Sequence, residues 1–408
     1  MKAANAIDDI RRRSRDGAIL MSPRWVDLYL LTGLFLLSLE FVQIGGARIN
    51  QLWALVVLTF FLIKKSVRLQ GREVLAFGLF IGVALLLTGF SGYERIKPLE
   101  QIIKFVVIYP TFYLLGRSFG RHYLSHRLPF GYLALFGFLL YQLAVQKLNV
   151  PVIYQTVDFM QDSLHGSFKE HNWLATFFFC ASFVVFLQSD KKTSDIARFL
   201  ALGAAVALLS ESKTVLIPCG IVLMTQTRGR IYLKIIAVTA GSALYYYKFS
   251  QQLSGDMLSV KLEQERGLAL IVSLGLVAKD WLGHGFGFVE SYFSTSAISV
   301  IGLGAGTNSI FCSPLDLMLI AGVPGVVFWL MFFCGLGLGW RTMLCLSPLA
   351  AWSFINPMHQ SEMVYLFCGY LVSWGRGTMP AVAARKRSRT VRAPMHVEHR
   401  YQFNRRAT

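Results

Sequence analysis

The sequence carries little charge for its length. Only 15% of its 408 residues are charged, whereas 54% are hydrophobic. A soluble domain averages about 25% charged residues. This composition argues against a chain that folds around one core and exposes a charged surface to water. It indicates a polytopic membrane protein, for which length gives no count of soluble domains.

The patterns of disulfide-rich and metal-binding proteins are also missing. The six cysteines form no CxxC pair, so we predict neither a disulfide framework nor a zinc site. The sequence has no DxD pair and no HExxH motif, and we therefore expect neither a catalytic metal nor a cofactor. It shows no internal repeat, which disfavours an inverted-repeat transporter.

The start of the sequence lacks the features of a cleavable signal. A basic cluster at residues 11–15 precedes a full-length apolar run, not a short run that ends at small residues. We expect this first run to be retained. Much of the net charge of +18 lies in the tail, residues 376–406, and in short loops. The positive-inside rule places basic residues there, so we expect contact with anionic lipid and no nucleic acid partner.

Long apolar runs dominate the rest of the chain, and a helical span needs about 20 such residues. Qualifying runs begin near Trp25, Leu52, Val74, Gln101, Leu128, Trp173, Ala197, Thr214, Ile231, Ser313, Met343 and Glu362. They predict an all-α, polytopic transmembrane helical bundle of about twelve spans. The predicted parts are a cytoplasmic N-terminal segment (1–24), spans one to nine (25–247), an extracytoplasmic loop (248–311), spans ten to twelve (312–375) and a basic cytoplasmic tail (376–408).

Basic residues in alternate connections predict the orientation. These groups are Arg11, Arg12, Arg13 and Arg15; Lys64, Lys65, Arg68 and Arg72; Arg117, Arg121 and Arg127; Lys191, Lys192 and Arg198; Arg228, Arg230 and Lys234; Arg341; and the tail. By the positive-inside rule they lie in the cytoplasm, together with both termini. The loop at 248–311 then lies on the outer, periplasmic side.

Three polar segments fall on this predicted outer face. They are GSFKEHN at 166–172, SESKT at 210–214, and the loop that contains Arg266 and WLGHGFG at 281–287. Three ionisable residues at span ends, Glu40, Lys104 and Asp316, lie on the same side. Charge beside a span is costly unless it has a partner or a function. We therefore predict a polar cavity open to the outer side, with snorkelling as the alternative for Lys104.

The predicted outer loop contains helix-compatible sequence. Residues 256–280 are free of proline, with weak points at Gly267 and Gly275. We predict a helix that lies along the membrane interface. The glycines of WLGHGFG then allow the tight turns that end it.

Four motifs give the chain a family resemblance. GSFKEHNWLA at 166–175 resembles the G-x-F-x-x-x-N-x-x-A segment of the O-antigen ligase and Wzy-type polymerase superfamily. SESKT is similar to its S-x-S-R-T motif, with Lys213 in place of arginine. Arg266 with WLGHGFG is similar to its R…W…P-x-x-G-x-G loop, and GVPG at 322–325 to a turn in the following span. The motifs occur in the family's order over residues 166–333.

The resemblance implies an activity and a location. Such enzymes transfer glycan from a polyprenyl diphosphate carrier to an acceptor hydroxyl, at the outer face of the bacterial inner membrane. Ligases of the family usually carry a histidine before the span with the small-residue turn, and residues 306–316 contain none. We therefore expect a polymerase of lipid-linked repeat units that makes exopolysaccharide or O-antigen, usually with a chain-length copolymerase as partner. The alternatives are an O-antigen ligase that acts on lipid A-core and, in another class, a lipid-linked oligosaccharide transporter or flippase.

The chemistry of this transfer suggests which residues act. Cleavage of the sugar–phosphate bond leaves negative charge on the diphosphate, which fixed cations stabilise. Arg266 and Lys213 are the first candidates for this role, followed by Lys169, with Asn172 as a further substrate-binding residue. Arginine can bind phosphate through two donors, whereas lysine acts as a point charge.

The acceptor hydroxyl also needs a general base. The candidates are His171, Glu170, His284 and Asp316, and the sequence does not rank them. Structural roles are the alternatives: Lys213 as a loop end, Arg266 as a solvated residue paired with Glu263, Asn172 as the cap of the sixth span, and His284 as a loop histidine.

Overall fold

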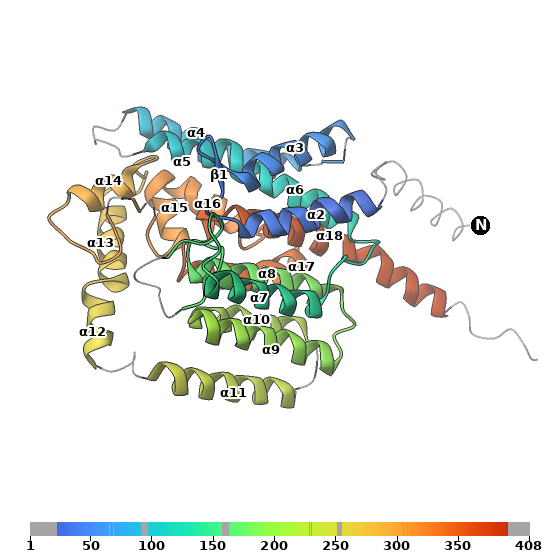
Figure 1. Ribbon diagram of the computed structural model, residues 1–408. Coiled ribbons are helices and arrows are strands. Elements are labelled where there is room, and N and C mark those ends of the chain that lie inside the picture. Colours follow the sequence, from blue (N-terminus) through green and yellow to red (C-terminus); the bar gives the residue numbers. More distant parts are fainter. Residues whose placement is uncertain are drawn as a thin grey trace, which may run out of the picture.

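The computed structural model of this chain is almost entirely helical (Figure 1). It describes residues 23–64, 66–67, 69–90, 97–156, 163–227, 229, 231–250, 255–304, 306–307 and 309–390. The predictions for residues 1–22, Lys65, Arg68, Arg228, Arg230, Asn308 and the end of the tail (391–408) fall outside these residues. Within the described part, the strands are one short antiparallel pair, β1 (Gln43–Ile44) and β2 (Ala47–Arg48).

Helices overlap each of the twelve predicted apolar runs. They are α2 (Pro23–Ser38), α3 (Ile49–Ile63), α4 (Gly71–Phe90), α5 (Pro98–Ile103) with η1 (Lys104–Ile108) and α6 (Tyr109–His122), α7 (Tyr132–Lys147), α8 (His171–Gln188), α9 (Thr193–Ser210), η3 (Lys213–Val215) with α10 (Leu216–Gln226), α11 (Ile231–Phe249), α15 (Ser313–Ala321) with α16 (Val323–Phe332), α17 (Trp340–Ser353) and, after η5 (Met358–Gln360), α18 (Glu362–Thr390).

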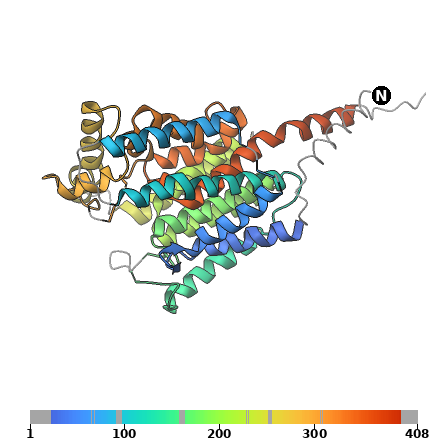
Figure 2. The same ribbon diagram turned by 90° about the horizontal axis from the view of Figure 1, so that it is seen from above.

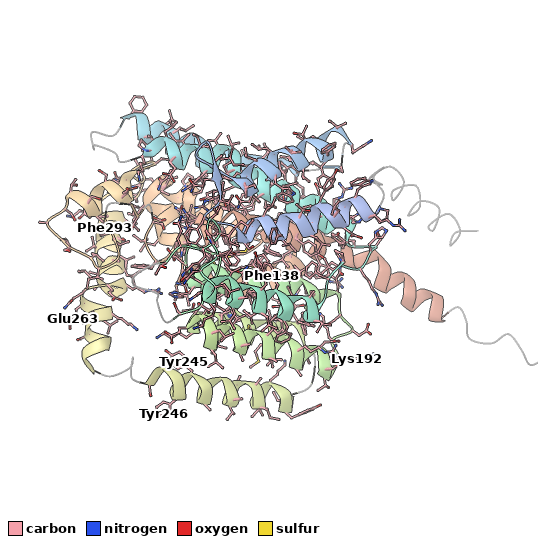
Figure 3. All side chains as sticks on the ribbon, viewed as in Figure 1. Phe138, Lys192, Tyr245, Tyr246, Glu263 and Phe293 are labelled. Atoms are coloured by element: carbon pink, nitrogen blue, oxygen red, sulfur yellow. The ribbon has the colours of Figure 1, made fainter. Side chains whose placement is uncertain are left out.

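The bundle has two distinct ends. Its helices lie side by side and run back and forth, while α12 (Gly255–Glu263), α13 (Arg266–Lys279) and α14 (Phe288–Thr295) gather at one end (Figures 1 and 2). In Figure 1, α12 and α13 run across the direction of the bundle, and α18 extends beyond its opposite end. Figure 3 shows Glu263 on α12 and Lys192, before α9, at these opposite ends.

Four described segments are long and apolar enough to cross a membrane: Gly71–Phe90, Pro98–His122, His171–Gln188 and Thr193–Ser210. Only 22% of the apolar window of α4 is buried, compared with 78% for α8. The surface of α4 therefore presents large apolar side chains, such as Leu75 and Leu86, in contiguous stretches that suit lipid better than water. The count of twelve spans stays a prediction.

Glycines bring α6 and α18 together. A Cβ on Gly116 would lie 1.8 Å from the carbonyl oxygen of Leu366, and one on Gly369 would lie 2.1 Å from the carbonyl oxygen of Tyr113. Only residues without a side chain allow two helix backbones to approach this closely. The contact fixes α18, whose first residue is Glu362.

The predicted interfacial helix is broken into two. Helix α12 ends at Glu263 and α13 begins at Arg266, beside the weak point at Gly267. A Cβ on Gly267 would lie 2.2 Å from the carbonyl oxygen of Leu262, so this glycine permits the close turn. Gly275 lies inside α13 without a break.

A second helix break, in GVPG, lies against the WLGHGFG motif. Gly322, with a φ of 59°, separates α15 from α16. The N–H groups of His284 and Gly285, in WLGHGFG, donate to the carbonyl oxygens of Leu319 (2.7 Å) and Ile320 (2.8 Å). The glycine-rich loop therefore packs against the interrupted span.

Candidate functional site

A cavity of about 800 Å³ lies where the recognised segments meet. Lys169, Glu170, His171 and Asn172 line it from the start of α8, and Arg266 lines it from the start of α13. Five of the eight residues that the sequence suggested thus share one cavity. Because Arg266 begins α13, the cavity lies at the end of the bundle that carries α12, α13 and α14.

Two glutamines of α7 hold the GSFKEHN segment in place. Oε1 of Gln142 accepts hydrogen bonds from the N–H (2.8 Å) and the hydroxyl (2.9 Å) of Ser167. Oε1 of Gln146 accepts the N–H groups of His165 (2.9 Å) and Gly166 (3.0 Å). Gly166 has a φ of 57°, and a Cβ there would lie 2.3 Å from Oε1 of Gln142. Glycine therefore satisfies both the backbone conformation and the space at this position.

Asn172 joins this segment to SESKT. Its Oδ1 accepts the hydroxyl of Ser212 at 2.8 Å. The suggestion that Asn172 caps the sixth span is wrong, because α8 begins at His171, which leaves Asn172 inside the helix and Glu170 at the N-cap position. Further along SESKT, Oγ1 of Thr214 accepts the indole N–H of Trp352 at 3.1 Å. SESKT thus connects α8 to α17.

Lys213 lies beside the cavity without lining it. Its pKa is lowered to about 8, mainly by burial and in addition by the nearby cations Lys261 and Arg266. Three basic side chains from separate segments therefore form one positive region next to the cavity. An anion bound there would stabilise the charged form of Lys213.

Arg266 is held by backbone and by an aromatic ring. Its guanidinium donates to the carbonyl oxygen of Ile355 at 2.9 Å and lies 4.9 Å from the ring centre of Phe311, a cation–π distance. Glu263 ends α12 and Arg266 begins α13. The two residues therefore lie on different helices. The i,i+3 spacing within one helix, which would pair Arg266 with Glu263, is absent.

The opposite wall of the cavity contains a cluster that the sequence analysis missed. Glu362 accepts hydrogen bonds from the side-chain amides of Asn50 (3.1 Å) and Gln51 (2.5 Å), and Arg48 lies 3.4 Å away. Lys104 pairs with Glu100 at 2.7 Å. The sequence position of Lys104 predicts that it lies on this face. The partners of Glu362 are more than 300 residues away in the chain, so no local pattern predicts them.

Glu40 contacts Lys169, and Glu170 follows Lys169 in the chain. Oε2 of Glu40 accepts the N–H of Lys169 at 2.8 Å. Burial raises the pKa of Glu40 to about 7, against the opposing effects of Arg48 and of that N–H group. Desolvation in the cavity raises the pKa of Glu170, and the Arg266 cation opposes the rise. A carboxyl group with a raised pKa suits proton transfer near neutral pH.

Asp316 lies behind the cavity wall. Its carboxylate is 2.7 Å from Nε2 of His359, and both side chains are fully buried. Neither residue lines the cavity, whereas Met358 and Gln360, on either side of His359, do. The pair therefore anchors η5 against the start of α15. No sequence motif marks His359, which lies 43 residues after Asp316 in the chain.

His284 also lies away from the cavity lining. Its ring stacks on Phe288 with centres 3.9 Å apart, and its Nδ1 is 3.8 Å from Asp280. These contacts hold the loop between α13 and α14, in keeping with the role of a loop histidine.

No known protein family matches the chain, and no curated protein matches it. Among the described residues, no group of three or more His, Cys, Asp and Glu side chains is placed to hold a metal ion.

Proposed function

We propose that the chain is a membrane glycosyltransferase that polymerises polyprenyl-diphosphate-linked oligosaccharide repeat units into exopolysaccharide or O-antigen. The observation that carries this proposal is the convergence of distant segments on one charged cavity at one end of an apolar bundle. Arg266 and the Lys169–Asn172 segment line this cavity together, and Ser212 of SESKT is bonded to Asn172.

We place the protein in the bacterial inner membrane with twelve spans, both termini in the cytoplasm and the cavity on the periplasmic side. The back-and-forth course of the helices supports the placement of alternate connections on opposite sides. So does the position of Lys192, a residue of a predicted cytoplasmic connection, at the end opposite α12 (Figure 3). A cysteine introduced at Ser296 should react with an impermeant reagent in intact spheroplasts, and one introduced at Lys192 should not. The reverse pattern would contradict the orientation.

The charges of the cavity suit a diphosphate at the membrane interface. Arg48, Lys104, Lys169 and Arg266 line the cavity, together with Glu40, Glu100, Glu170 and Glu362. Arg48 and Lys104 have carboxylate partners there, whereas Arg266 is held by a carbonyl oxygen and a ring. Arg266 therefore keeps donors for an anion, and Lys213 adds positive charge behind it.

The reaction would proceed by displacement at the sugar carbon bound to the diphosphate. The acceptor hydroxyl oxygen forms the new C–O bond and gives its proton to Glu170. The bond from that carbon to the phosphate oxygen breaks, and its electron pair leaves with the carrier diphosphate, which Arg266 and Lys213 stabilise. His171, the other candidate base that lines the cavity, is next to Glu170 in the chain.

The convergence of the motif segments on one cavity favours an enzyme over a flippase, because a flippase needs polar residues along its whole path. A polymerase is preferred to a ligase because the histidine expected in a ligase is absent from residues 306–316, while His359 is buried. A chain-length copolymerase is the protein partner that a polymerase would need.

A deletion strain distinguishes these activities. Loss of a polymerase should leave single repeat units on the carrier at the periplasmic face, and the gene for the Arg266→Ala variant should not restore polymer. The exposed Lys192→Ala variant is the control and should restore it. Long, untransferred carrier-linked chains would indicate a ligase, and units trapped at the cytoplasmic face would indicate a flippase.

A further inference from the structure

A second cavity, of about 640 Å³, shares a wall with the first. Lys169 and Glu170 line both cavities. The hairpin of β1 and β2 also lies between them, because Gln43 lines the second cavity and its partner in the hairpin, Arg48, lines the first. The two cavities are therefore adjacent, and Glu170 is accessible from both.

The two cavities differ in chemistry. Apart from the shared pair, the second is lined by Phe41, Val42, Gln43, Val152 and Gln155, none of which is charged. A diphosphate would prefer the first cavity, with its four basic side chains. Amide groups that both donate and accept hydrogen bonds, beside an apolar ring, suit a neutral ligand rich in hydroxyl groups.

The aromatic ring in the second cavity is fixed by its neighbours. Phe41 meets His165 edge to face, with ring centres 6.5 Å apart. His165 in turn stacks on Tyr154 at 5.2 Å, the residue before Gln155. His165 also belongs to the segment that Gln146 holds. The ring and the Gln155 segment are thus attached to the support of the GSFKEHN segment, which gives the second cavity a constant position relative to Glu170.

We propose that the second cavity is the acceptor subsite, which binds the uncharged sugars of the incoming glycan and presents a hydroxyl group to Glu170 across the shared wall. This proposal rests on the proposed function, in which the first cavity holds the donor diphosphate. It explains how one enzyme holds two glycan substrates: the phosphate of one lies among cations, and the sugars of the other lie among amides and a ring.

The test uses the full-length protein in lipid nanodiscs and two probes. The first probe is the free oligosaccharide released by mild acid from the carrier-linked repeat unit, and the second is undecaprenyl diphosphate. The Phe41→Ala/Gln155→Ala variant should bind the oligosaccharide at least tenfold more weakly, with undecaprenyl diphosphate binding within twofold of wild type. Its KM for the acceptor should rise. The control is Tyr246→Ala, at an exposed aromatic residue on α11 (Figure 3) that lines neither cavity. It should change neither the binding of the two probes nor the KM.

The outcomes separate this proposal from the proposed function. Oligosaccharide binding equal to wild type in the double variant, or no binding by the wild type, overturns the acceptor subsite even if polymer is made. In another outcome, oligosaccharide binding depends on Phe41 and Gln155, but the protein never extends carrier-linked units. This outcome supports the subsite and refutes the polymerase. Weakened binding of both probes would show that the variant damages the shared wall, and would overturn the separation of the two subsites.

Discussion

The two ends of the bundle hold charge in different ways. At the end from which α18 extends, the fully buried Glu73 accepts a hydrogen bond from Tyr113 at 2.6 Å and pairs with Arg117, with Arg376 3.8 Å away. At the other end, Arg48 is 25% exposed where it meets Glu362, and Arg266 faces a cavity. Helix α18 supplies a residue to both ends, Glu362 and Arg376, about 21 Å apart along its axis.

This difference separates charge that serves the fold from charge available to a ligand. Around Glu73 the carboxylate is fully buried, and two cations, Arg117 and Arg376, lie beside it. Around Arg266 the donors border open space. Removal of a buried charge at the first end should therefore reduce stability, and removal of a charge that lines the cavity at the second end should reduce activity.

The largest effect is expected from Arg117→Ala. It leaves Glu73 buried without its closest cation, and loss of one member of a buried pair costs about 3–5 kcal/mol. Thermal denaturation in detergent should shift to clearly lower temperature. The Glu73→Gln/Arg117→Met double variant should recover part of the loss, and the exposed Lys192→Ala variant should match wild type. If Arg117→Ala is as stable as wild type, the buried charges around Glu73 do not stabilise the fold, and the proposed difference between the two ends is wrong.

Arg266→Ala should reduce the transfer rate without unfolding the protein. By analogy with single oxyanion donors, the loss is about 10²–10³-fold, or about 2.7–4 kcal/mol of barrier. Steady-state rates with carrier-linked repeat units measure it, and Arg266→Lys should retain part of the activity. If the denaturation temperature falls instead and the rate per folded molecule is unchanged, Arg266 serves the fold.

Gly166→Ala, at the cavity end, should lower both the stability and the transfer rate. It forces alanine into a positive φ against Gln142, and such strain costs about 1–3 kcal/mol. Gly220→Ala in α10 is the matched control, because no atom lies within 4 Å of its added Cβ; it should be neutral or slightly stabilising. Equal behaviour of the two variants would contradict the role assigned to the Gln142 contact.

The smallest effect is a change in pH dependence. Lys213, with a pKa of about 8, is charged below that pH and becomes neutral above it. Its contribution to diphosphate binding should therefore be present at pH 7 and decline as pH rises through 8. The affinity for undecaprenyl diphosphate should show this decline in wild type. Lys213→Arg should retain its affinity to higher pH. The same pH profile in wild type and Lys213→Arg would show that the charge of Lys213 does not contribute to diphosphate binding.

The sequence located helices over the twelve apolar runs, because apolar runs act locally, and the family resemblance pointed to the turn at 322–325. It predicted one helix where α12 and α13 are separate. It also brought Lys169 and Arg266 into one region through topology. It missed the clusters of Glu362 and of His359 with Asp316, whose partners come from distant helices. Their pairing depends on how the helices rotate against each other, and close contacts such as that of Gly116 with Leu366 decide this rotation. The hydrophobic periodicity of a single helix does not predict this rotation.

The most direct test of the account is extension of a carrier-linked repeat unit by the purified protein. Wild type, supplied with no other glycan, should give products of two or more repeat units that remain on the carrier, and Arg266→Ala should give almost none. Failure of wild type to extend the unit, with glycosylation of lipid A-core when that acceptor is supplied in a parallel assay, would contradict it. Equal extension by Arg266→Ala would also contradict it.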